Sequence, residues 1–147
     1  MKKVFFVAVA SIVLFSCVKE GPAGKDGEDG TQINTYYFDV FPNHWKNSGT
    51  YGSAGHYCYE ERTLPALTSS VLNEGAVLVY VIFDDTYNHQ LPHIEPFYDN
   101  GYYIRTIRYD LQPGKVAFIV EDSDFKTLNP PYSGEKVQFK VVIISKI

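Results

Sequence analysis

Apolar and polar residues alternate along much of this chain with a period of two, which is the spacing of a strand that buries one face. Val116, Phe118 and Val120 share one face of the segment 115–121, and the opposite face carries a charged residue at each end. The segment 136–141 repeats the pattern, because Lys, Gln and Lys separate its apolar residues. We therefore predict a half-buried β-strand over each of these segments.

A second pattern, apolar on both faces, occupies residues 76–83 with the sequence AVLVYVIF. It predicts a central strand that is covered on both sides. Further strands are predicted over residues 36–41, 51–62 and 102–109. Residues 68–73 predict a short helix, with Thr68 as its N-cap and Gly75 as its end.

The strands follow one another closely, and the segments between them are rich in Gly, Pro and Asn, as in 112–114 and 129–131. This spacing predicts an all-β fold, an antiparallel β-sandwich that residues 33–147 form as a single domain. An immunoglobulin-like or Greek-key topology is the first expectation, and a jelly roll is the alternative. The length of this segment is sufficient for one hydrophobic core.

The start of the chain has the features of an export signal. Two lysines precede the uncharged run 4–15, which is shorter than the roughly 20 residues of a membrane-spanning helix. The sequence LFSC at 14–17 looks like a lipobox, in which Cys17 receives a diacylglycerol group and becomes the mature N-terminus. Residues 1–16 are therefore predicted to be a lipoprotein signal peptide, and an ordinary secretory signal is the alternative.

The segment 17–32 combines the lipidated cysteine with a glycine repeat. Four G-x-y triplets in register begin at Gly21, Gly24, Gly27 and Gly30. A collagen triple helix needs many proline-rich triplets, and this segment has few triplets with a single proline among them. We expect a collagen-like but flexible spacer between the lipid and the domain rather than a trimer.

The lipobox cysteine, the stretch GPAGKDGEDG and one β-rich domain together resemble the collagen-like-repeat lipoproteins of the Bacteroidota cell envelope. The stretches PALTSSVLNEGAVLVYV and HQLPHIEPFY are similar to recurrent segments of that group. The resemblance implies that the protein is anchored by its lipid at the outer membrane, on the periplasmic or the surface side. It implies no particular activity.

The charge of the chain bears on its partners. Loss of residues 1–16 leaves 11 basic and 17 acidic residues, a formal net charge of −6. Nucleic-acid binding depends on clustered Lys and Arg, so this balance argues against a nucleic-acid partner. It also gives no attraction to anionic headgroups, so the lipid is predicted to hold the protein at the membrane. The domain itself is expected to be monomeric.

Familiar catalytic motifs are absent from the sequence, which contains no G-x-S-x-G, G-x-x-x-x-G-K, H-E-x-x-H or C-x-x-C. We expect no enzymatic activity and no cofactor. His89 and His93 are four residues apart, but Pro92 opposes a helix there, so the spacing does not indicate a zinc pair. His44 and His56 lie on other segments, and all four histidines are expected to be solvated. Acylation of Cys17 leaves Cys58 without a disulfide partner, and its strand-like setting between two tyrosines predicts a buried, inert thiol.

Aromatic residues make up 16% of the chain, and some of them flank predicted turns, where their rings can stack on sugars or peptides. The candidate ligand-binding residues are Trp45, Tyr98, Tyr102 and Tyr103. Packing of Trp45 into the core is the alternative for that residue. Asp122 and Asp124 follow a predicted strand and are candidate calcium ligands, with solvated turn-forming aspartates as the alternative.

These observations predict a lipid-anchored cell-envelope protein whose β-domain is a non-catalytic binding or accessory module. A glycan, a peptide or an envelope protein is the expected type of partner. A structural or assembly subunit of an envelope complex is the alternative function, and a hydrolase with an unfamiliar site is a third hypothesis.

Overall fold

The computed structural model describes residues 30–83, 86–98, 101–132, 134 and 136–146. Its strands are β1 (Thr31–Val40), β2 (Lys46–Ser48), β3 (Tyr57–Thr63), β4 (Ala76–Phe83), β5 (Tyr87–Gln90), β6 (His93–Phe97), β7 (Tyr103–Gln112), β8 (Lys115–Asp122) and β9 (Val137–Lys146). A 3-10 helix, η1 (Pro42–His44), and one turn and a half of α-helix, α1 (Ser69–Glu74), accompany them. Within these described ranges, no helix has the length and apolar character needed to cross a bilayer.

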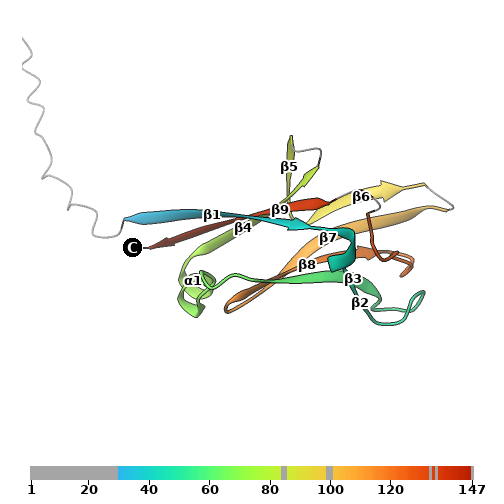
Figure 1. Ribbon diagram of the computed structural model, residues 1–147, viewed down its shortest axis with the longest axis horizontal. Helices are drawn as coiled ribbons and strands as arrows, with labels where there is room; N and C mark the ends of the chain where they lie inside the picture. The colour runs from blue at the N-terminus through green and yellow to red at the C-terminus, as the bar shows by residue number, and fades with distance from the viewer. Residues whose placement is uncertain (1–29, 84–85, 99–100, 133, 135, 147) are drawn as a thin grey trace, which may run out of the picture.

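The strands form two antiparallel sheets, in the orders β1-β9-β4-β5 and β2-β3-β8-β7-β6. The long strands run along the longest dimension of the molecule, and the two sheets pack face to face (Figure 1). This arrangement confirms the predicted all-β antiparallel sandwich. In the larger sheet, β6, β7 and β8 follow one another in the chain and lie side by side, and β3 pairs with the other edge of β8. The order β3-β8-β7-β6 is a Greek key in which the strand beside β8 comes first in the chain instead of last. β1 pairs with β9, and β3 pairs with β8, so along the chain the second pair lies between the members of the first. Jelly rolls have the same nested pairing.

The two strands with the clearest alternation are confirmed as β8 and β9. Their inward residues Val116, Phe118, Val120, Val137, Phe139 and Val141 are all buried. The prediction for residues 76–83 holds less completely. In β4, Val79, Val81 and Ile82 are buried, whereas Ala76 is exposed and Tyr80 is half-buried. The outer face of β4 is thus only partly covered.

The predicted strand over 51–62 begins later, at Tyr57, because the segment before it is a loop. Gly49, Gly52 and Gly55 have φ angles of +74°, +75° and +85°, a region that glycine adopts without strain. A Cβ at Gly49 would lie 2.7 Å from the carbonyl oxygen of Gly55, so the loop closes tightly on itself. The loop carries Tyr51 to one end of the sandwich.

The predicted helix is confirmed as α1, where the Thr68 hydroxyl accepts a hydrogen bond of 3.2 Å from the N–H of Val71. The short strands β2, β5 and β6 were not predicted. β6 contains Pro96, which a strand tolerates at the edge of a sheet, and β6 is an edge strand here.

An aromatic stack joins the two sheets in the core. Phe118 of β8 and Phe139 of β9 lie with ring centroids 4.0 Å apart and planes inclined by 7°, and both side chains are fully buried. Phe38 packs against Phe118 at 5.8 Å, and Trp45 packs against Phe139 at 6.4 Å. Together with the aliphatic residues of the core, these buried rings provide the apolar contact between the two sheets.

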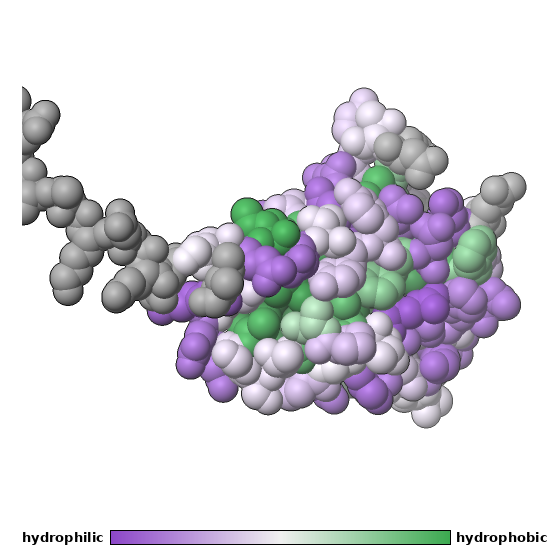
Figure 2. Space-filling view, turned by 60° about the vertical axis from the view of Figure 1, so that its left-hand side comes forward, coloured by the Kyte–Doolittle hydropathy of each residue, from purple (hydrophilic) through white to green (hydrophobic). Residues whose placement is uncertain are grey.

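Figure 2 shows apolar residues along a strip of the surface that polar residues border.

Candidate functional site

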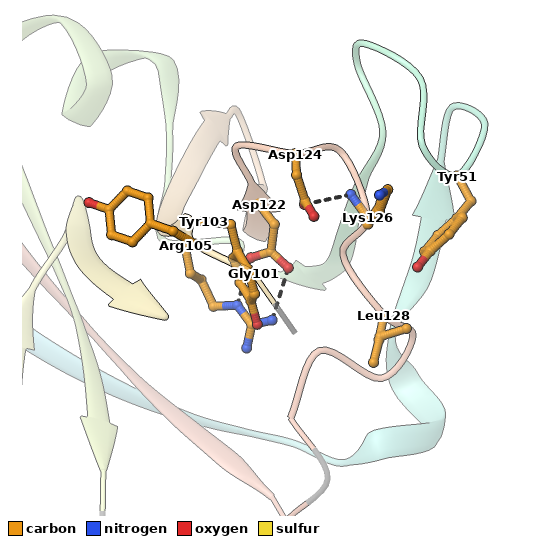
Figure 3. A pocket seen from close by; sticks show the side chains of 9 residues that line it. Tyr51, Gly101, Tyr103, Arg105, Asp122, Asp124, Lys126 and Leu128 are labelled. Carbon is orange, nitrogen blue, oxygen red and sulfur yellow. Dashed lines mark hydrogen bonds and ion pairs between the residues drawn. The ribbon is translucent and has the colours of Figure 1, made fainter. Parts of the chain in front are cut away.

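A pocket of about 400 Å³ lies at one end of the sandwich, where loops meet the ends of β7 and β8 (Figure 3). It is lined by Tyr51, Gly101, Tyr102, Tyr103, Arg105, Asp122, Asp124, Lys126 and Leu128. Tyr51 comes from the glycine loop between β2 and β3. Gly101 and Tyr102 lie directly before β7, and the remaining lining residues come from the start of β7, the end of β8 and the loop that follows β8. The pocket therefore combines three segments that are distant in the sequence.

An ion pair between Arg105 and Asp122 forms the floor of this pocket. The two residues are directly opposite each other in the register of β7 and β8. The Arg105 Nε donates to Asp122 Oδ1 at 2.8 Å, and the Arg105 Nη2 donates to Asp122 Oδ2 at 2.9 Å. This bidentate geometry gives the pair both strength and a fixed orientation. The antiparallel pairing of the strands is what brings the two charges together.

The Arg105–Asp122 pair is buried, since the two residues are 5% and 2% exposed. The guanidinium carbon lies 4.6 Å from the ring centroid of Phe97, 5.1 Å from that of Tyr132 and 5.9 Å from that of Tyr103. Burial by itself would lower the pKa of Arg105, but the hydrogen bonds and charge of Asp122 outweigh it and raise that pKa above its ordinary value. The floor of the pocket is thus a buried ion pair with three aromatic rings around its guanidinium group.

The loop after β8 is held by hydrogen bonds to the same region. The Arg105 Nη1 donates to the carbonyl oxygen of Pro131 at 2.8 Å, and the Asp122 N–H donates to the Thr127 hydroxyl at 2.8 Å. The Lys126 N–H donates to Asp124 Oδ1 at 3.0 Å, which closes a turn. These bonds present the exposed side chains of Asp124 and Lys126 at the pocket (Figure 3).

His56 fastens the glycine loop to the loop after β8. Its Nδ1 lies 3.1 Å from the carbonyl oxygen of Ser48, and its Nε2 lies 3.0 Å from that of Thr127. The Gly52 N–H also donates to the carbonyl oxygen of Phe125 at 2.7 Å. His56 is 1% exposed, so the expectation of a solvated histidine is wrong at this position. Which of the two carbonyl oxygens accepts the ring N–H depends on the tautomer of His56.

The structure brings four of the predicted site residues together: Tyr102, Tyr103, Asp122 and Asp124 all line the pocket. Tyr98 does not line it, but the Tyr98 ring contacts the ring of Tyr102 with centroids 5.3 Å apart. Cys17, the predicted lipidation site, lies outside the described residues.

Trp45 is buried in the core and does not form part of an exposed ligand-binding surface. It is 5% exposed and belongs to the core cluster, where it packs against Phe139. The structure therefore corresponds to the core alternative for this residue. Its position directly after η1 directs the indole between the sheets even though the local sequence is typical of a turn.

The geometry does not fit calcium at Asp122 and Asp124. Both oxygens of Asp122 accept hydrogen bonds from Arg105, so a guanidinium occupies the place of a cation. In the part of the chain that the structure describes, no three or more His, Cys, Asp or Glu side chains are grouped closely enough to hold a metal ion. These contacts disfavour calcium ligation, because Asp122 is the partner of Arg105 and Asp124 accepts a hydrogen bond from the Lys126 N–H.

Sequence reasoning missed Tyr51, Arg105, Lys126 and Leu128. Arg105 lies within the predicted strand 102–109 and close to two candidate tyrosines, which was the one available signal. Its pairing with Asp122 depends on the register of two strands, and local sequence does not encode that register.

Cys58 lies beside this region and is fully buried. Its thiol donates to the carbonyl oxygen of Leu128 at 3.2 Å and to Asn47 Oδ1 at 3.3 Å. Burial, with a smaller contribution from the negative charge of Asp122, raises the pKa of the thiol to about 11. Such a thiol is a structural hydrogen-bond donor rather than a nucleophile.

No family model matches this chain, and no match was found among the curated proteins or among the solved structures.

Replacement of Arg105 by methionine is expected to lower the free energy of unfolding by about 3–5 kcal/mol, because it leaves the buried Asp122 carboxylate without a partner. The double variant Arg105→Met/Asp122→Leu removes both charges and is expected to recover at least half of that loss. Urea denaturation of the two variants and the wild type measures the difference. A double variant that is less stable than Arg105→Met would contradict the assignment of an ion pair as the floor of the site.

The Cys58 thiol is expected to be unreactive in the folded protein. With Cys17→Ala in place, Cys58 is the single thiol of the mature chain, and its raised pKa leaves about 100-fold less thiolate at pH 8 than an ordinary cysteine has. Reaction with a chromogenic disulfide reagent should be slow in buffer and fast in urea. Rapid labelling in buffer, at the rate seen in urea, would show that the site is open.

Proposed function

We propose that this protein is a lipid-anchored component of the bacterial cell envelope whose β-domain binds a ligand in the pocket above Arg105 and Asp122. In this proposal the domain is a non-catalytic binding or accessory module, and a glycan or peptide of the envelope is its ligand. The observation that carries the proposal is the pocket itself, a preorganised cavity at one end of the domain.

The size and construction of the pocket support ligand binding. Its volume of about 400 Å³ falls within the range of about 300–1,000 Å³ that is usual for small-ligand sites. The polar groups of its floor are held by the bidentate pair and by the bond to Pro131. Groups that are already ordered lose little conformational entropy when a ligand binds.

A non-catalytic role is supported by the state of the carboxylates. Both Asp122 oxygens accept hydrogen bonds from a guanidinium, and Asp124 accepts one from the Lys126 N–H. A general acid or base needs an oxygen or nitrogen atom that is free to form a hydrogen bond with the reacting group of the substrate. These interactions favour holding and orienting a ligand over moving a proton.

The position of the pocket supports a tethered module. β1 begins at Thr31, at one end of the sandwich, and β8 runs toward the other end, where Asp122 and the pocket lie (Figure 1). In the proposal, the collagen-like segment joins the acylated Cys17 to the near end of the sandwich. The pocket would then face away from the membrane that holds the lipid.

Lipidation is tested by growth of the producing bacterium with radiolabelled palmitate. The wild-type protein is expected to carry the label and to fractionate with the outer membrane, because two or more acyl chains anchor a protein stably. The Cys17→Ala variant should lose both the label and the membrane association. Unacylated native protein that begins upstream of Cys17 would overturn the envelope part of the proposal.

Ligand binding is tested on an array that displays glycans and peptides side by side. The probe is the mature chain with Cys17→Ala, which keeps it in solution. Tyr102→Ala is expected to weaken retention about tenfold, because it removes an exposed ring of the pocket, whereas Tyr87→Ala should leave retention unchanged. The two tyrosines form a matched pair, because they are 64% and 65% exposed and Tyr87 does not line the pocket. Equal effects of the two substitutions would remove the pocket as the binding site.

A further inference from the structure

The rim of the pocket is aromatic and open to solvent. Tyr51 is 56% exposed and Tyr102 is 64% exposed, and they stand on different loops of the same cavity. Tyr98 packs against Tyr102 and extends the aromatic surface beyond the pocket. Leu128, 64% exposed, adds an apolar side chain to the lining of the same pocket (Figure 3). Flat, exposed rings gathered around a cavity indicate a surface that a ligand covers.

The charges of the pocket cancel. Arg105 and Lys126 are each balanced by a carboxylate, Asp122 and Asp124, so the formal charge of the lining is zero. The first pair is closed on itself by two hydrogen bonds. An anion or a cation that entered would lose hydration without meeting a net opposite charge, and a charge that leaves water without a partner is unfavourable. A neutral ligand avoids that loss.

The polar groups that remain open include both donors and acceptors. Lys126 supplies an exposed ammonium, and Asp124 is an exposed carboxylate of which one oxygen is bonded to the turn. The phenol hydroxyl of Tyr102 can donate and accept. A ligand that uses all of these groups needs hydroxyls that act in both senses, which is a property of sugars.

The strand pairing disfavours an extended peptide at this place. β7 is paired with β6 over residues 103–107 and with β8 over residues 105–112, and β8 is paired with β3 over residues 115–120. Beyond these ladders, at the pocket, the Asp122 N–H donates to the Thr127 hydroxyl and the Ser123 N–H donates to the carbonyl oxygen of Ile104. A peptide that binds as an added strand needs a free strand edge, and neither of these strands offers one. Recognition in the pocket must therefore come from side chains.

We propose that the pocket binds a neutral saccharide, with Tyr51 and Tyr102 packed against the apolar faces of sugar rings and with Asp124 and Lys126 hydrogen-bonded to ring hydroxyls. This inference rests on the proposed function, because it names the ligand class of the same pocket. It adds a preference for uncharged sugars, which follows from the balanced charges of the lining.

The test measures binding of the mature Cys17→Ala chain to immobilised neutral hexose oligosaccharides, with uronic-acid and glucosamine oligosaccharides of the same length as charged counterparts. The neutral series is expected to bind best. Its dissociation constant should change by less than about twofold between about 50 and 500 mM NaCl, because no net charge is neutralised on binding.

Four variants locate the contacts. Asp124→Asn and Tyr102→Ala are each expected to weaken binding about tenfold, since the first removes a charged acceptor and the second removes a stacking ring. Tyr102→Phe should weaken it less than Tyr102→Ala, because the ring remains. Tyr87→Ala is the control outside the pocket, and circular dichroism verifies that each variant is folded.

The outcomes separate the two proposals. Preference for a charged saccharide or a peptide, with loss of that binding in Tyr102→Ala, would overturn the neutral-saccharide inference and leave the binding module in place. Absence of any ligand, or binding that Tyr102→Ala does not affect, would overturn both.

Discussion

Arg105 and Asp122 meet across two neighbouring strands, in a position where both side chains are buried and have little access to bulk water. Their bidentate pair holds the start of β7 to the end of β8, and the third guanidinium nitrogen reaches the carbonyl oxygen of Pro131. One side chain thus connects the sheet to the loop that follows it. A buried ion pair of this kind adds little net stability compared with apolar residues of the same shape. Its effect is on geometry, because it permits one arrangement of the loop and of the pocket floor.

Aromatic residues serve two different purposes in this domain. Phe118, Phe139 and Trp45 are buried between the sheets and supply apolar area to the core. Tyr51 and Tyr102 are exposed at the rim of the pocket. The hydroxyl of a tyrosine makes such exposure less unfavourable than that of a phenylalanine. The aromatic excess of the chain therefore reflects both a filled core and an open rim.

The two ends of the sandwich differ in what they carry. The chain enters β1 at one end, and the loops of the other end contribute Tyr51, Asp124 and Lys126 to the pocket (Figure 1). In the proposed function, the membrane anchor and the ligand-binding pocket lie at opposite ends of the domain, because the spacer joins the lipid to the end that lacks the pocket. Our inference of a neutral saccharide then follows from the balanced charge of the cavity and its exposed rings.

The alternation of Val116, Phe118 and Val120 was enough to predict a strand and its buried face, because a period of two assigns each residue to one of two sides. Thr68 could also be predicted from the sequence as a helix N-cap, because an N-cap interaction involves only neighbouring residues. Candidate residues near turns, such as Tyr102 and Asp124, were found in the same way.

Alternation does not say which strand lies beside which, and that decision belongs to the tertiary structure. The partner of Asp122, the burial of Trp45 and the approach of Tyr51 to the pocket all depend on contacts between segments that are far apart in the sequence. Strand register and sheet packing are set by the burial of the whole core, so no local pattern contains them. The sequence by itself determined the class of fold and the buried faces of its clearest strands, and the packing of the two sheets determined the site.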